Sequence, residues 1–431
     1  MTASDRWPDW SSLSESERPG ALARCQSLAR AQQEQFDAFV AFEDPAPVPK
    51  AGSLAGLPYA VKDMVVSANR RPSCGLPIAP DLGASKQASV LTLLDQAGAV
   101  RVGFTRMTAL AYEPSGAGTA KNPWNTAFAP GGSSSGPAVA VASGAAVVAL
   151  GSDTGGSVRI PAQACGVTAW KPTWGRVPAD GTMVLSPSLD TIGVLGRSAV
   201  DIATVASVLT SGQVVPSDAS KPTVAVVEDA LLACEDPVQR ACRDGISQIL
   251  SAGLSNRRVD ALEFMREAGD QTLLVMQAEA WRTWAPLIEQ GRCDPVMAKR
   301  LAKGGSIGDE QLAESLAARG EALKAVEDRL FAGADVAVLP VMPIRTPPLS
   351  EVTPGSPDFT PRTLYGLSAY TRFVNYLGFP AIAVPVGFDD RGLPVALQIV
   401  GRAGSDGILL ALAARLQSAT GWHNMIPNEI R

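Results

Sequence analysis

The spacing of hydrophobic residues changes along the chain, and each change predicts a different element. Apolar positions recur every three or four residues between 18 and 41, after a start that contains Ser, Glu and Pro, which predicts a packing helix. From 50 to 210, short apolar runs alternate with helical segments. SVLTLLDQAG is typical of a helix, AVRVGFT of a strand, and AVAVASGAAVVALG of a helix followed by a strand. This alternation indicates an α/β sandwich.

The second half of the chain has a longer helical region between strands. TVAVV at 223–227 predicts a strand. The stretch after it has the charged faces typical of helices, and we expect these helices to cover the site rather than to contribute catalytic residues. VAVLP at 336–340 predicts another strand, which leads into a proline-rich loop that ends near Pro361 and is expected to face a substrate. FPAIAVPVGFDDRGLPVALQIVG predicts two strands joined by a turn, followed by a helix that Ser405 or Asp406 could cap.

Composition and charge narrow the class of protein and its partners. Apolar residues make up 46% of the chain and charged residues 18%, which is the composition of an ordinary compact globular protein. The net charge of −5, without clustered surplus Lys and Arg, argues against nucleic acid and favours a small-molecule partner. The longest apolar stretch, 137–150, is shorter than the roughly 20 residues that cross a bilayer, so we expect no membrane partner.

The N-terminal segment and the cysteines indicate the compartment. Residues 1–19 are polar and lack the apolar core of a secretory signal. The six cysteines form no CxxC pair, which fits reduced thiols better than a disulfide framework or a zinc site. We therefore expect a cytoplasmic protein in which Cys74 and Cys165 are packing residues.

The chain contains a single histidine, His423, close to the last residue. A Ser-His-Asp or Cys-His hydrolase would have to use this side chain, and a histidine-rich metal centre cannot be built. We expect His423 to be a surface or tail residue, so a serine nucleophile needs another base. A lysine can serve if desolvation lowers its pKa from about 10.4 towards neutrality. Lys62, which an apolar strand carries into the core, can be that base or a strand-end lysine paired with Asp63.

Two clusters rich in glycine and serine, PGGSSSG at 130–136 and SDTGGSVR at 152–159, flank an apolar segment. Each cluster could be a flexible loop, but its position at the mouth of an apolar element favours a structured turn. The turn before Ser157 would leave consecutive backbone N–H groups free to stabilise a developing oxyanion, as acyl transfer requires. Neither cluster contains the GKS or GKT of a phosphate-binding loop, and GRAGSDG at 401–407 lacks dinucleotide-site spacing.

Motifs along most of the chain resemble those of the amidase signature family. GLPYAVKDM is similar to the family's lysine motif, PGGSSSG to its middle-serine motif, and SDTGGSVRIPAQACGVTAWKPTWGRVP to its nucleophile segment. NPWN at 122–125, PSLDTIGVLGRS at 187–198 and FPAIAVPVGFDDRGLPVALQIVG continue the pattern. The short stretch at 105–123 resembles that of compact malonamidase-like bacterial amidases, which suggests a small substrate.

The resemblance implies an α/β/α sandwich in which helices cover both faces of a large, mixed, twisted β-sheet. With no internal repeat and no linker-like break in composition, we expect a single amidase domain over 1–431. Its expected parts are an N-terminal packing helix at 18–41, a catalytic core at 50–210, a variable helical and loop region at 211–370 that shapes the substrate pocket, and a sheet-completing part at 371–431.

Carried over to this sequence, the resemblance implies that Ser157 is the nucleophile, that Ser133 relays its proton and that Lys62 is the base. Ser133 would follow a cis peptide bond with Gly132, and no metal or organic cofactor would be needed. The oxyanion would be bound by the main-chain N–H groups of Thr154, Gly155, Gly156 and Ser157. The expected substrate contacts are Gly132, Ser134 and Arg159.

Four charged residues near the motifs have further interpretations. Arg159 could clamp a substrate carboxylate through two hydrogen bonds, or it could be structural, since arginine at this place is common in the family. Arg70 and Arg71 replace the family's usual turn after the lysine motif. Near the site entrance they could favour an acidic substrate, or they could be solvated. Asp190 is expected to organise the backbone.

The expected function is hydrolysis of the C–N bond of a small carboxylic amide through an acyl-enzyme on Ser157, with release of ammonia or an amine. Two alternatives stay open. One is the glutamine-hydrolysing catalytic subunit of a tRNA-dependent amidotransferase, and the other is a catalytically inactive binding protein that keeps the fold. The expected partner is a small-molecule amide, without nucleic acid or membrane, and a homodimer is left open.

Overall fold

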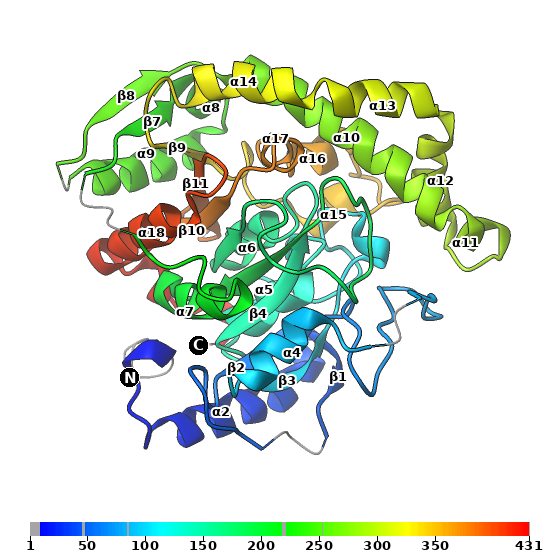
Figure 1. Cartoon of the computed structure of the whole chain (residues 1–431), viewed down its shortest axis with the longest axis vertical. Coiled ribbons are helices and arrows are strands. Elements are labelled where there is room, and N and C mark those ends of the chain that lie inside the picture. The colour runs from blue at the N-terminus through cyan, green and yellow to red at the C-terminus, as the bar shows by residue number, and fades with distance from the viewer. Residues whose placement is uncertain (1–8, 45–47, 84–85, 218–220, 252, 431) are drawn as a thin grey trace.

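An eleven-stranded mixed β-sheet runs through the computed structural model, which describes residues 9–44, 48–83, 86–217, 221–251 and 253–430 (Figure 1). The strand order is β1-β3-β2-β4-β6-β5-β10-β11-β9-β7-β8. The strands are β1 (Phe39–Phe42), β2 (Pro58–Lys62), β3 (Val100–Thr105), β4 (Val148–Asp153), β5 (Thr168–Lys171), β6 (Thr191–Gly196), β7 (Val224–Val227), β8 (Asn256–Val259), β9 (Val336–Pro340), β10 (Ala381–Phe388) and β11 (Pro394–Gly401).

The C-terminal hairpin joins two blocks of the sheet. β2 pairs in parallel with β3 and β4, and β7 pairs in parallel with β8 and β9. Between these blocks, β10 runs antiparallel to β5, with Ile382 opposite Trp170, and β11 runs antiparallel to β9, with Leu397 opposite Pro340. The hairpin predicted from the sequence is therefore present, and it lies inside the sheet rather than at an edge.

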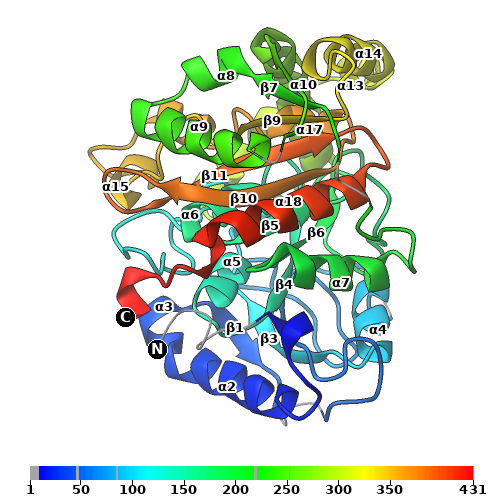
Figure 2. The same ribbon diagram turned by 90° about the vertical axis from the view of Figure 1, so that its left-hand side faces the viewer.

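Helices cover both faces of the sheet, as expected. One face carries α4 (Ser89–Gln96), α7 (Ala199–Leu209), α18 (Asp406–Thr420) and α9 (Asp236–Leu250), and Figure 2 shows α7, α18 and α9 as neighbours. The opposite face carries α5 (Ser135–Ala142) and α6 (Arg159–Cys165). The other helices are α2 (Arg18–Ala31), α3 (Gln33–Phe36), α8 (Glu228–Leu232), α10 (Leu262–Trp284), α11 (Pro286–Glu289), α12 (Pro295–Ala302), α13 (Asp309–Ala317), α14 (Arg319–Leu330), α15 (Leu349–Val352), α16 (Pro361–Gly366) and α17 (Arg372–Tyr376).

The strands divide their side chains between two cores, because successive residues of a strand point to opposite faces. On β2, Tyr59 and Val61 pack in the core under α4 and α7, whereas Ala60 packs in the core under α5. On β4, Leu150 and Ala149 divide in the same way. We call the first side the aliphatic face and the second the alanine-lined face. The strand alanines of the alanine-lined face are Ala60, Ala149, Ala169, Ala383 and Ala396.

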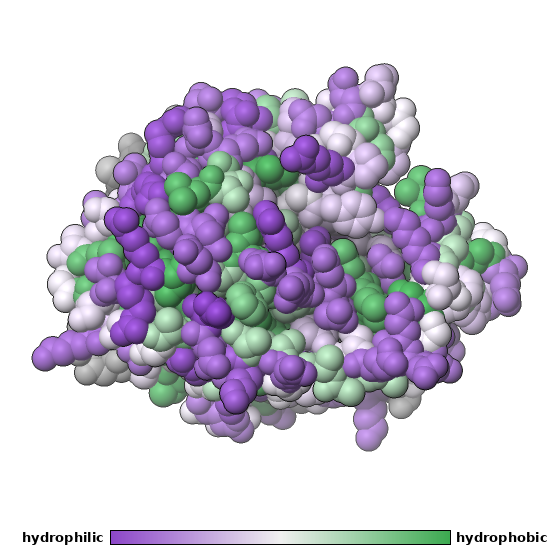
Figure 3. Space-filling view, turned by 90° about the horizontal axis from the view of Figure 1, so that it is seen from above, coloured by the Kyte–Doolittle hydropathy of each residue, from purple (hydrophilic) through white to green (hydrophobic). Residues whose placement is uncertain are grey.

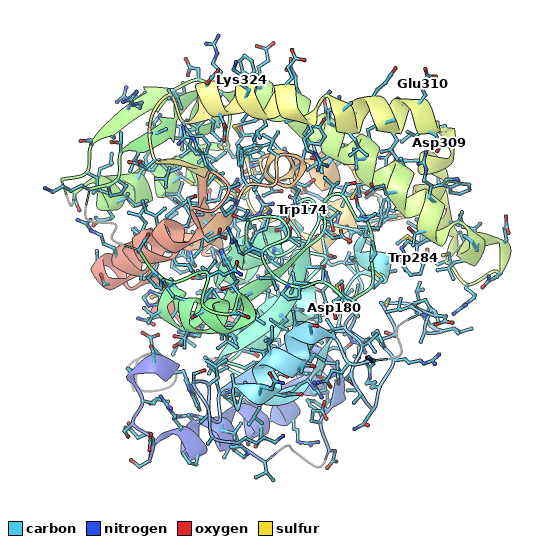
Figure 4. All side chains as sticks on the ribbon, in the orientation of Figure 1. Trp174, Asp180, Trp284, Asp309, Glu310 and Lys324 are labelled. Atoms are coloured by element: carbon cyan, nitrogen blue, oxygen red, sulfur yellow. The ribbon has the colours of Figure 1, made fainter. Side chains whose placement is uncertain are left out.

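A helical layer from the second half of the chain lies over the upper part of the sheet in Figure 1. Within it, α10 packs against α17, and α12, α13 and α14 pack against α10. The face seen from above is largely hydrophilic, with scattered apolar patches (Figure 3). Asp309 and Glu310 at the start of α13, and Lys324 on α14, lie along the upper edge in Figure 4. The charged sequence of this region therefore faces solvent.

Three local predictions are wrong. The helix predicted at 18–41 ends at Ala31, and after the short α3 the chain turns at Asp37, which has a φ of 49°, and enters β1. The long helical region contains an unexpected strand, β8, whose first three residues are exposed at the sheet edge and so give no apolar alternation. The proline-rich loop after β9 contains the short helix α15.

The predicted surface position of His423 is also wrong. His423 lies in a short 3₁₀ turn, Trp422–Asn424, that packs against β10, and only 8% of its surface is exposed. Burial lowers the pKa of its imidazole to about 4. The tail after it is docked as well, because the Glu429 N–H donates a hydrogen bond to the Pro123 carbonyl at 3.1 Å. His423 nevertheless lines none of the cavities described below.

Across the residues that the structure describes, no helix combines the length and the apolar character that crossing a membrane requires. The first eight residues of the polar N-terminal segment lie outside the described residues, so the expectation that this segment carries no secretory signal stays a prediction.

Candidate active site

The ends of two strands and the starts of two helices meet beside the alanine-lined face. Lys62 is the last residue of β2, Ser133 lies in the turn before α5, and Ser157 lies in the turn between β4 and α6. The Ser134 N–H donates to the Ser157 carbonyl at 3.2 Å, which holds the two serine-rich turns against each other. The structure therefore brings Lys62, Ser133 and Ser157 into one place.

Lys62 is fully buried and hydrogen-bonds to two serines. Its Nζ lies 2.6 Å from Ser133 Oγ and 2.8 Å from Ser152 Oγ. Burial lowers the pKa of Lys62 to about 7, even though the carboxylates of Asp190 and Asp153 act in the opposite direction. An ammonium in such a place would be costly, so the neutral amine is accessible near neutral pH.

Two interpretations of neighbouring residues are settled by their partners. Asp63 forms an ion pair with Arg70, not with Lys62, and it also accepts hydrogen bonds from Ser73. Arg70 is therefore neutralised within the protein, with its guanidinium over the Phe104 ring, while Arg71 is exposed. The second serine on Lys62, Ser152, was not among the predicted site residues because its place in SDTGGSVR gives no sign of which way its hydroxyl points.

The turn around Ser133 is built from backbone packed against backbone. The peptide bond between Gly132 and Ser133 is cis, as the resemblance implied. A Cβ on Gly132 would lie 2.6 Å from the Glu113 carbonyl, so only glycine fits there. The Gly132 N–H donates to the Pro114 carbonyl at 2.7 Å, and Ser134 Oγ hydrogen-bonds to the main chain of Ser152.

The turn before Ser157 is organised by Asp153. Its carboxylate accepts the Gly156 N–H at 2.8 Å and the Val158 N–H at 3.3 Å. Gly156 has a φ of 128°, and a Cβ there would lie 2.2 Å from Thr371 Oγ1, so the turn requires glycine. The N–H groups of Gly155 and Ser157 have no hydrogen-bond partner among the described residues. Of the expected oxyanion donors, Gly156 is thus occupied within the protein.

Arg159 is an internal crosslink. It is completely buried and forms two hydrogen bonds of 3.0 Å with Asp153. Although burial by itself would raise the pKa of Asp153, the Arg159 guanidinium prevails and holds that pKa at about 2. The other contacts of Arg159 are with Gln398 Oε1, the Thr371 carbonyl and Asn375 Oδ1. These partners leave no group of Arg159 free to bind a substrate carboxylate. This contradicts the interpretation of Arg159 as a substrate clamp and fits a structural role.

Asp190 supports the other side of the nucleophile turn. It accepts a hydrogen bond from Thr154 Oγ1 at 2.6 Å and from the N–H groups of Leu185 and Ser186. Burial raises the pKa of Asp190 to about 6. The structure therefore places Asp190 where a backbone organiser was expected.

Ser157 opens into a cavity of about 70 Å³ beneath the helical layer. Ser157 is 8% exposed, whereas Lys62 and Ser133 have no exposed surface, so the hydroxyl next to the cavity is that of Ser157. Gly132, Ser134 and Arg159 do not line the cavity. Its walls are formed by Ala111, Tyr112, Pro114, Thr154, Gly155, Ser157, Ile160, Thr272, Leu273, Met276, Gln277, Arg300, Lys303, Leu364, Tyr365, Ser368 and Arg372.

Most of these wall residues could not be found from the sequence. Most come from α10, α12, the turn after α12 and α16, within the 211–370 region expected to shape the pocket. Arg372 comes from α17, in the part that was expected only to complete the sheet. Cys74 and Cys165, in contrast, are buried away from the cavity, and burial raises the pKa of both thiols. They are packing residues, as expected.

Comparison with solved structures gives close matches along almost the whole chain. A crystal structure of an amidase is 27% identical, with a TM-score of 0.82 over 93% of this chain and 96% of that one. A glutamyl-tRNA(Gln) amidotransferase subunit from Thermotoga maritima is 25% identical, with a TM-score of 0.83 over 99% of this chain and 97% of that one. A fold and a site of this kind are those of an amide-hydrolysing enzyme.

The chain belongs to the Amidase family, whose model matches residues 16–410. Curated relatives include a glutamyl-tRNA(Gln) amidotransferase subunit from Psychrobacter cryohalolentis, which is 32% identical over 93% of this chain and 89% of its own length. The corresponding protein of Thioalkalivibrio sulfidiphilus is 31% identical, over 88% of this chain and 86% of its own length.

Proposed function

We propose that this chain hydrolyses the C–N bond of a small carboxylic amide through an acyl-enzyme on Ser157, with release of ammonia or an amine. The observation that carries the proposal is the 2.6 Å contact between Ser133 Oγ and the Nζ of Lys62, a lysine whose pKa burial lowers to about 7. A lysine with that pKa is partly neutral at ordinary pH and can accept a proton, whereas a solvated lysine with a pKa near 10.4 cannot.

The proposed proton path runs from Ser157 through Ser133 to Lys62, and its second step follows the hydrogen bond between Ser133 Oγ and Lys62 Nζ. Neutral Lys62 accepts the hydroxyl proton of Ser133 while Ser133 Oγ accepts that of Ser157, whose oxygen attacks the amide carbon. When the tetrahedral intermediate collapses, a proton returns along the same path to the leaving nitrogen, and the C–N bond breaks. Water then attacks the ester on Ser157, gives one proton to the path and releases the carboxylic acid. Every proton is thus carried by groups of this chain or by water.

The negative charge that develops on the carbonyl oxygen is stabilised by the nucleophile turn. The N–H groups of Gly155 and Ser157 are free of other partners among the described residues, and both residues line the cavity. Thr154 lines the cavity as well and completes the set of donors. Asp153 fixes the turn by accepting the Gly156 N–H, so the donors are oriented before a substrate arrives.

The proposal extends to the organisation of the protein. Strands or helices from all four expected parts of the chain contribute to one sheet and its two cores, which supports a single amidase domain over 1–431. We assign this domain to the cytoplasm. Its partner is a small-molecule amide rather than nucleic acid or a membrane, and a homodimer is left open.

Glutamine is the substrate of a second candidate function, which the names of the curated relatives favour. Free glutamine carries an α-ammonium group as well as an α-carboxylate. No Asp or Glu is among the described residues that line the cavity, so the cavity has no carboxylate to hold that ammonium. The residues that line the cavity therefore favour another small amide over glutamine as the substrate.

Ammonia release from a panel of small amides, dicarboxylic monoamides, ureido compounds and glutamine tests the proposal. Ser157→Ala should lower the rate on every accepted substrate by about 10⁴-fold or more, because the nucleophile is removed. Ser143→Ala, at the far end of α5, is a matched serine control that should keep the wild-type rate. Equal ammonia release by the wild type and Ser157→Ala would show that Ser157 is not the nucleophile. If glutamine were hydrolysed best, and only in the presence of a second protein chain, the amidotransferase alternative would hold.

A further inference from the structure

The cavity beside Ser157 has an unbalanced charge. Three basic side chains, Arg300, Lys303 and Arg372, line it, and no acidic residue does so among the described residues. The remaining walls are mostly apolar or aromatic. Elsewhere in the chain, many arginines have a carboxylate within 4 Å, such as Arg70 with Asp63 and Arg159 with Asp153. A cluster of basic groups without carboxylates therefore distinguishes this cavity.

Arg372 lies directly beside the nucleophile turn. A Cβ on Gly155 would lie 3.6 Å from Arg372 Cγ, so the arginine passes along the turn that ends in Ser157. Its Nη1 donates to Ser368 Oγ at 3.0 Å and to the Tyr365 carbonyl at 3.3 Å, both neutral acceptors. Its Nε is buried without a hydrogen-bond partner, and burial lowers the pKa of Arg372 although Asp270 acts in the opposite direction. The charge of Arg372 is thus only partly compensated.

Arg300 and Lys303 face the same cavity from the end of α12 and the turn that follows. The Arg300 guanidinium has no hydrogen bond or ion pair with the described residues. Its main-chain carbonyl accepts the Tyr112 hydroxyl at 3.4 Å and the Lys303 N–H. Arg300 also borders a second, wider cavity, where its charge favours the charged form of the Glu113 carboxyl without forming an ion pair with it, so Arg300 too is only partly compensated. Lys303 Nζ donates to Tyr365 Oη at 2.8 Å and lies over that ring, at the exposed rim.

We propose that the acyl part of the substrate ends in a carboxylate, which Arg372 and Arg300 bind, with Lys303 attracting it at the rim. This inference rests on the proposed function and names its substrate class: the monoamide of a short dicarboxylic acid. Arginine binds a carboxylate through paired N–H groups, and a partly buried cation without a carboxylate gains most from an incoming anion. The apolar walls, among them Ile160, Leu273 and Met276, would contact the short aliphatic segment between the amide and the carboxylate.

The test compares amides that differ only at the far end. The monoamides of succinic and glutaric acid are measured against the corresponding diamides, which are neutral and nearly isosteric, and against butyramide and valeramide, which end in methyl. The monoamides should have a kcat/KM about 10- to 100-fold higher, because a hydrogen-bonded charge is worth that factor in binding. Equal kcat/KM for monoamides and diamides would overturn the proposal and leave the amide-hydrolase function intact.

Variants identify the residues responsible. Arg372→Gln and Arg300→Gln should each lower the ratio of monoamide to diamide kcat/KM by about tenfold or more. Lys299→Gln removes an exposed charge from the same helix, outside the cavity wall, and should keep the ratio. If Lys299→Gln lowered the ratio as much as Arg300→Gln does, the preference would come from long-range electrostatic attraction and not from binding at this cavity. The proposal would then fail.

A binding measurement separates this proposal from the reaction itself. Calorimetry should show that Ser157→Ala binds glutarate, the product of the glutaric monoamide, at least tenfold more tightly than valerate. Arg372→Gln in the same background should abolish the difference. If no amide were hydrolysed by the wild type, the proposed function would fail, while glutarate binding would still decide the charge preference. Equal binding of glutarate and valerate would overturn that preference whatever the turnover.

Discussion

The two faces of the central sheet are packed with different residues and serve different ends. The aliphatic face meets α4, α7, α18 and α9 with large side chains such as Tyr59, Val61 and Leu150. The alanine-lined face meets α5 and α6 with Ala60 and Ala149 from the same two strands. Small strand residues let a helix approach the sheet closely, because less side-chain volume separates the two backbones.

The close approach on the alanine-lined face is what places the reactive groups. The turns that begin α5 and α6 lie against the ends of β2 and β4, and a Cβ on Gly151 of β4 would lie 2.9 Å from Ser134 Oγ. Lys62 leaves β2 on the same side as Ala60 and reaches Ser133 within 2.6 Å, out of contact with solvent. One face of the sheet therefore contributes stability through large side chains, and the other makes room for the reactive groups through small ones.

Among the changes that test the difference between the two faces, the largest expected effect concerns the buried lysine. Lys62→Met, which keeps the volume and removes the amine, should lower kcat/KM by roughly 10²- to 10⁴-fold, the contribution of a positioned base. Lys171 on β5 is a matched control, since burial also lowers its pKa to about 7 but its Nζ donates to the Pro172 carbonyl. Steady-state ammonia release should show Lys171→Met within about tenfold of wild type. Near-normal activity in Lys62→Met would break the link between the alanine-lined face and the chemistry.

Leu150→Ala tests the aliphatic face. Leu150 is buried in the core under α4 and α7, and its truncation should leave a cavity that lowers the free energy of unfolding by about 2–5 kcal/mol. Because its side chain points away from α5, kcat at a temperature well below the midpoint of unfolding should stay near the wild-type value. Denaturant unfolding and initial rates on the same preparation check both expectations. A loss of kcat in the still-folded variant would contradict the division between the faces.

Ala149→Leu is the reciprocal change on the neighbouring residue of β4. The added volume would press on α5 and should cost about 1–3 kcal/mol of unfolding free energy through overpacking. Unlike Leu150→Ala, it should also lower kcat in the folded enzyme, because α5 begins just after Ser133 and would be displaced from Lys62. For each variant, the decrease in kcat is divided by the decrease in unfolding free energy, and this ratio should be larger for Ala149→Leu than for Leu150→Ala. Equal ratios would mean that both faces act only through stability.

The smallest expected effect is a shift of the pH profile. Since neutral Lys62 is the base, kcat/KM should rise with pH through about 7 and level off above it. Asp190 favours the charged form of Lys62, so Asp190→Asn should move this rising limb to lower pH, by less than about one unit. Asparagine can keep the turn if its Oδ1 accepts the Leu185 and Ser186 N–H groups and its amide N–H donates to Thr154 Oγ1. A limb that moved upward, or did not move, would contradict the assignment of the limb to Lys62.

The sequence was sufficient where a pattern is local. Apolar runs located β2, β3, β4, β9 and the C-terminal hairpin, and the glycine-rich turn pointed to Ser157, whereas the role of Ser133 came from the family resemblance. The prediction of one helix over 18–41 failed because the backbone leaves the helical conformation at Gln32 and again at Asp37, and neither side chain predicts such a break. The residues of the cavity wall could not be predicted for another reason. Arg300 and Arg372 are 72 residues apart, and the packing of both α12 and α17 against α10 brings them to one cavity.

Arg159 shows the same limit at the site itself. Its spacing from Ser157 was compatible with a substrate clamp and with a structural role, and the choice depended on Asn375 and Gln398, more than 200 residues away. Ser152, one residue before Asp153, lay within a motif whose letters do not show that its hydroxyl contacts Lys62.

The position of the C-terminal hairpin has a consequence for how the protein is made on the ribosome. Because β10 and β11 lie between β5 and β9, a nascent chain that has emerged only as far as Gly378 lacks both strands that connect the β5 edge to the β9 edge. The lysine, both serines and the nucleophile turn have all been synthesised by then, yet Gln398, which hydrogen-bonds to Arg159 behind that turn, has not. The support behind the nucleophile turn is therefore complete only after Gln398 has been synthesised.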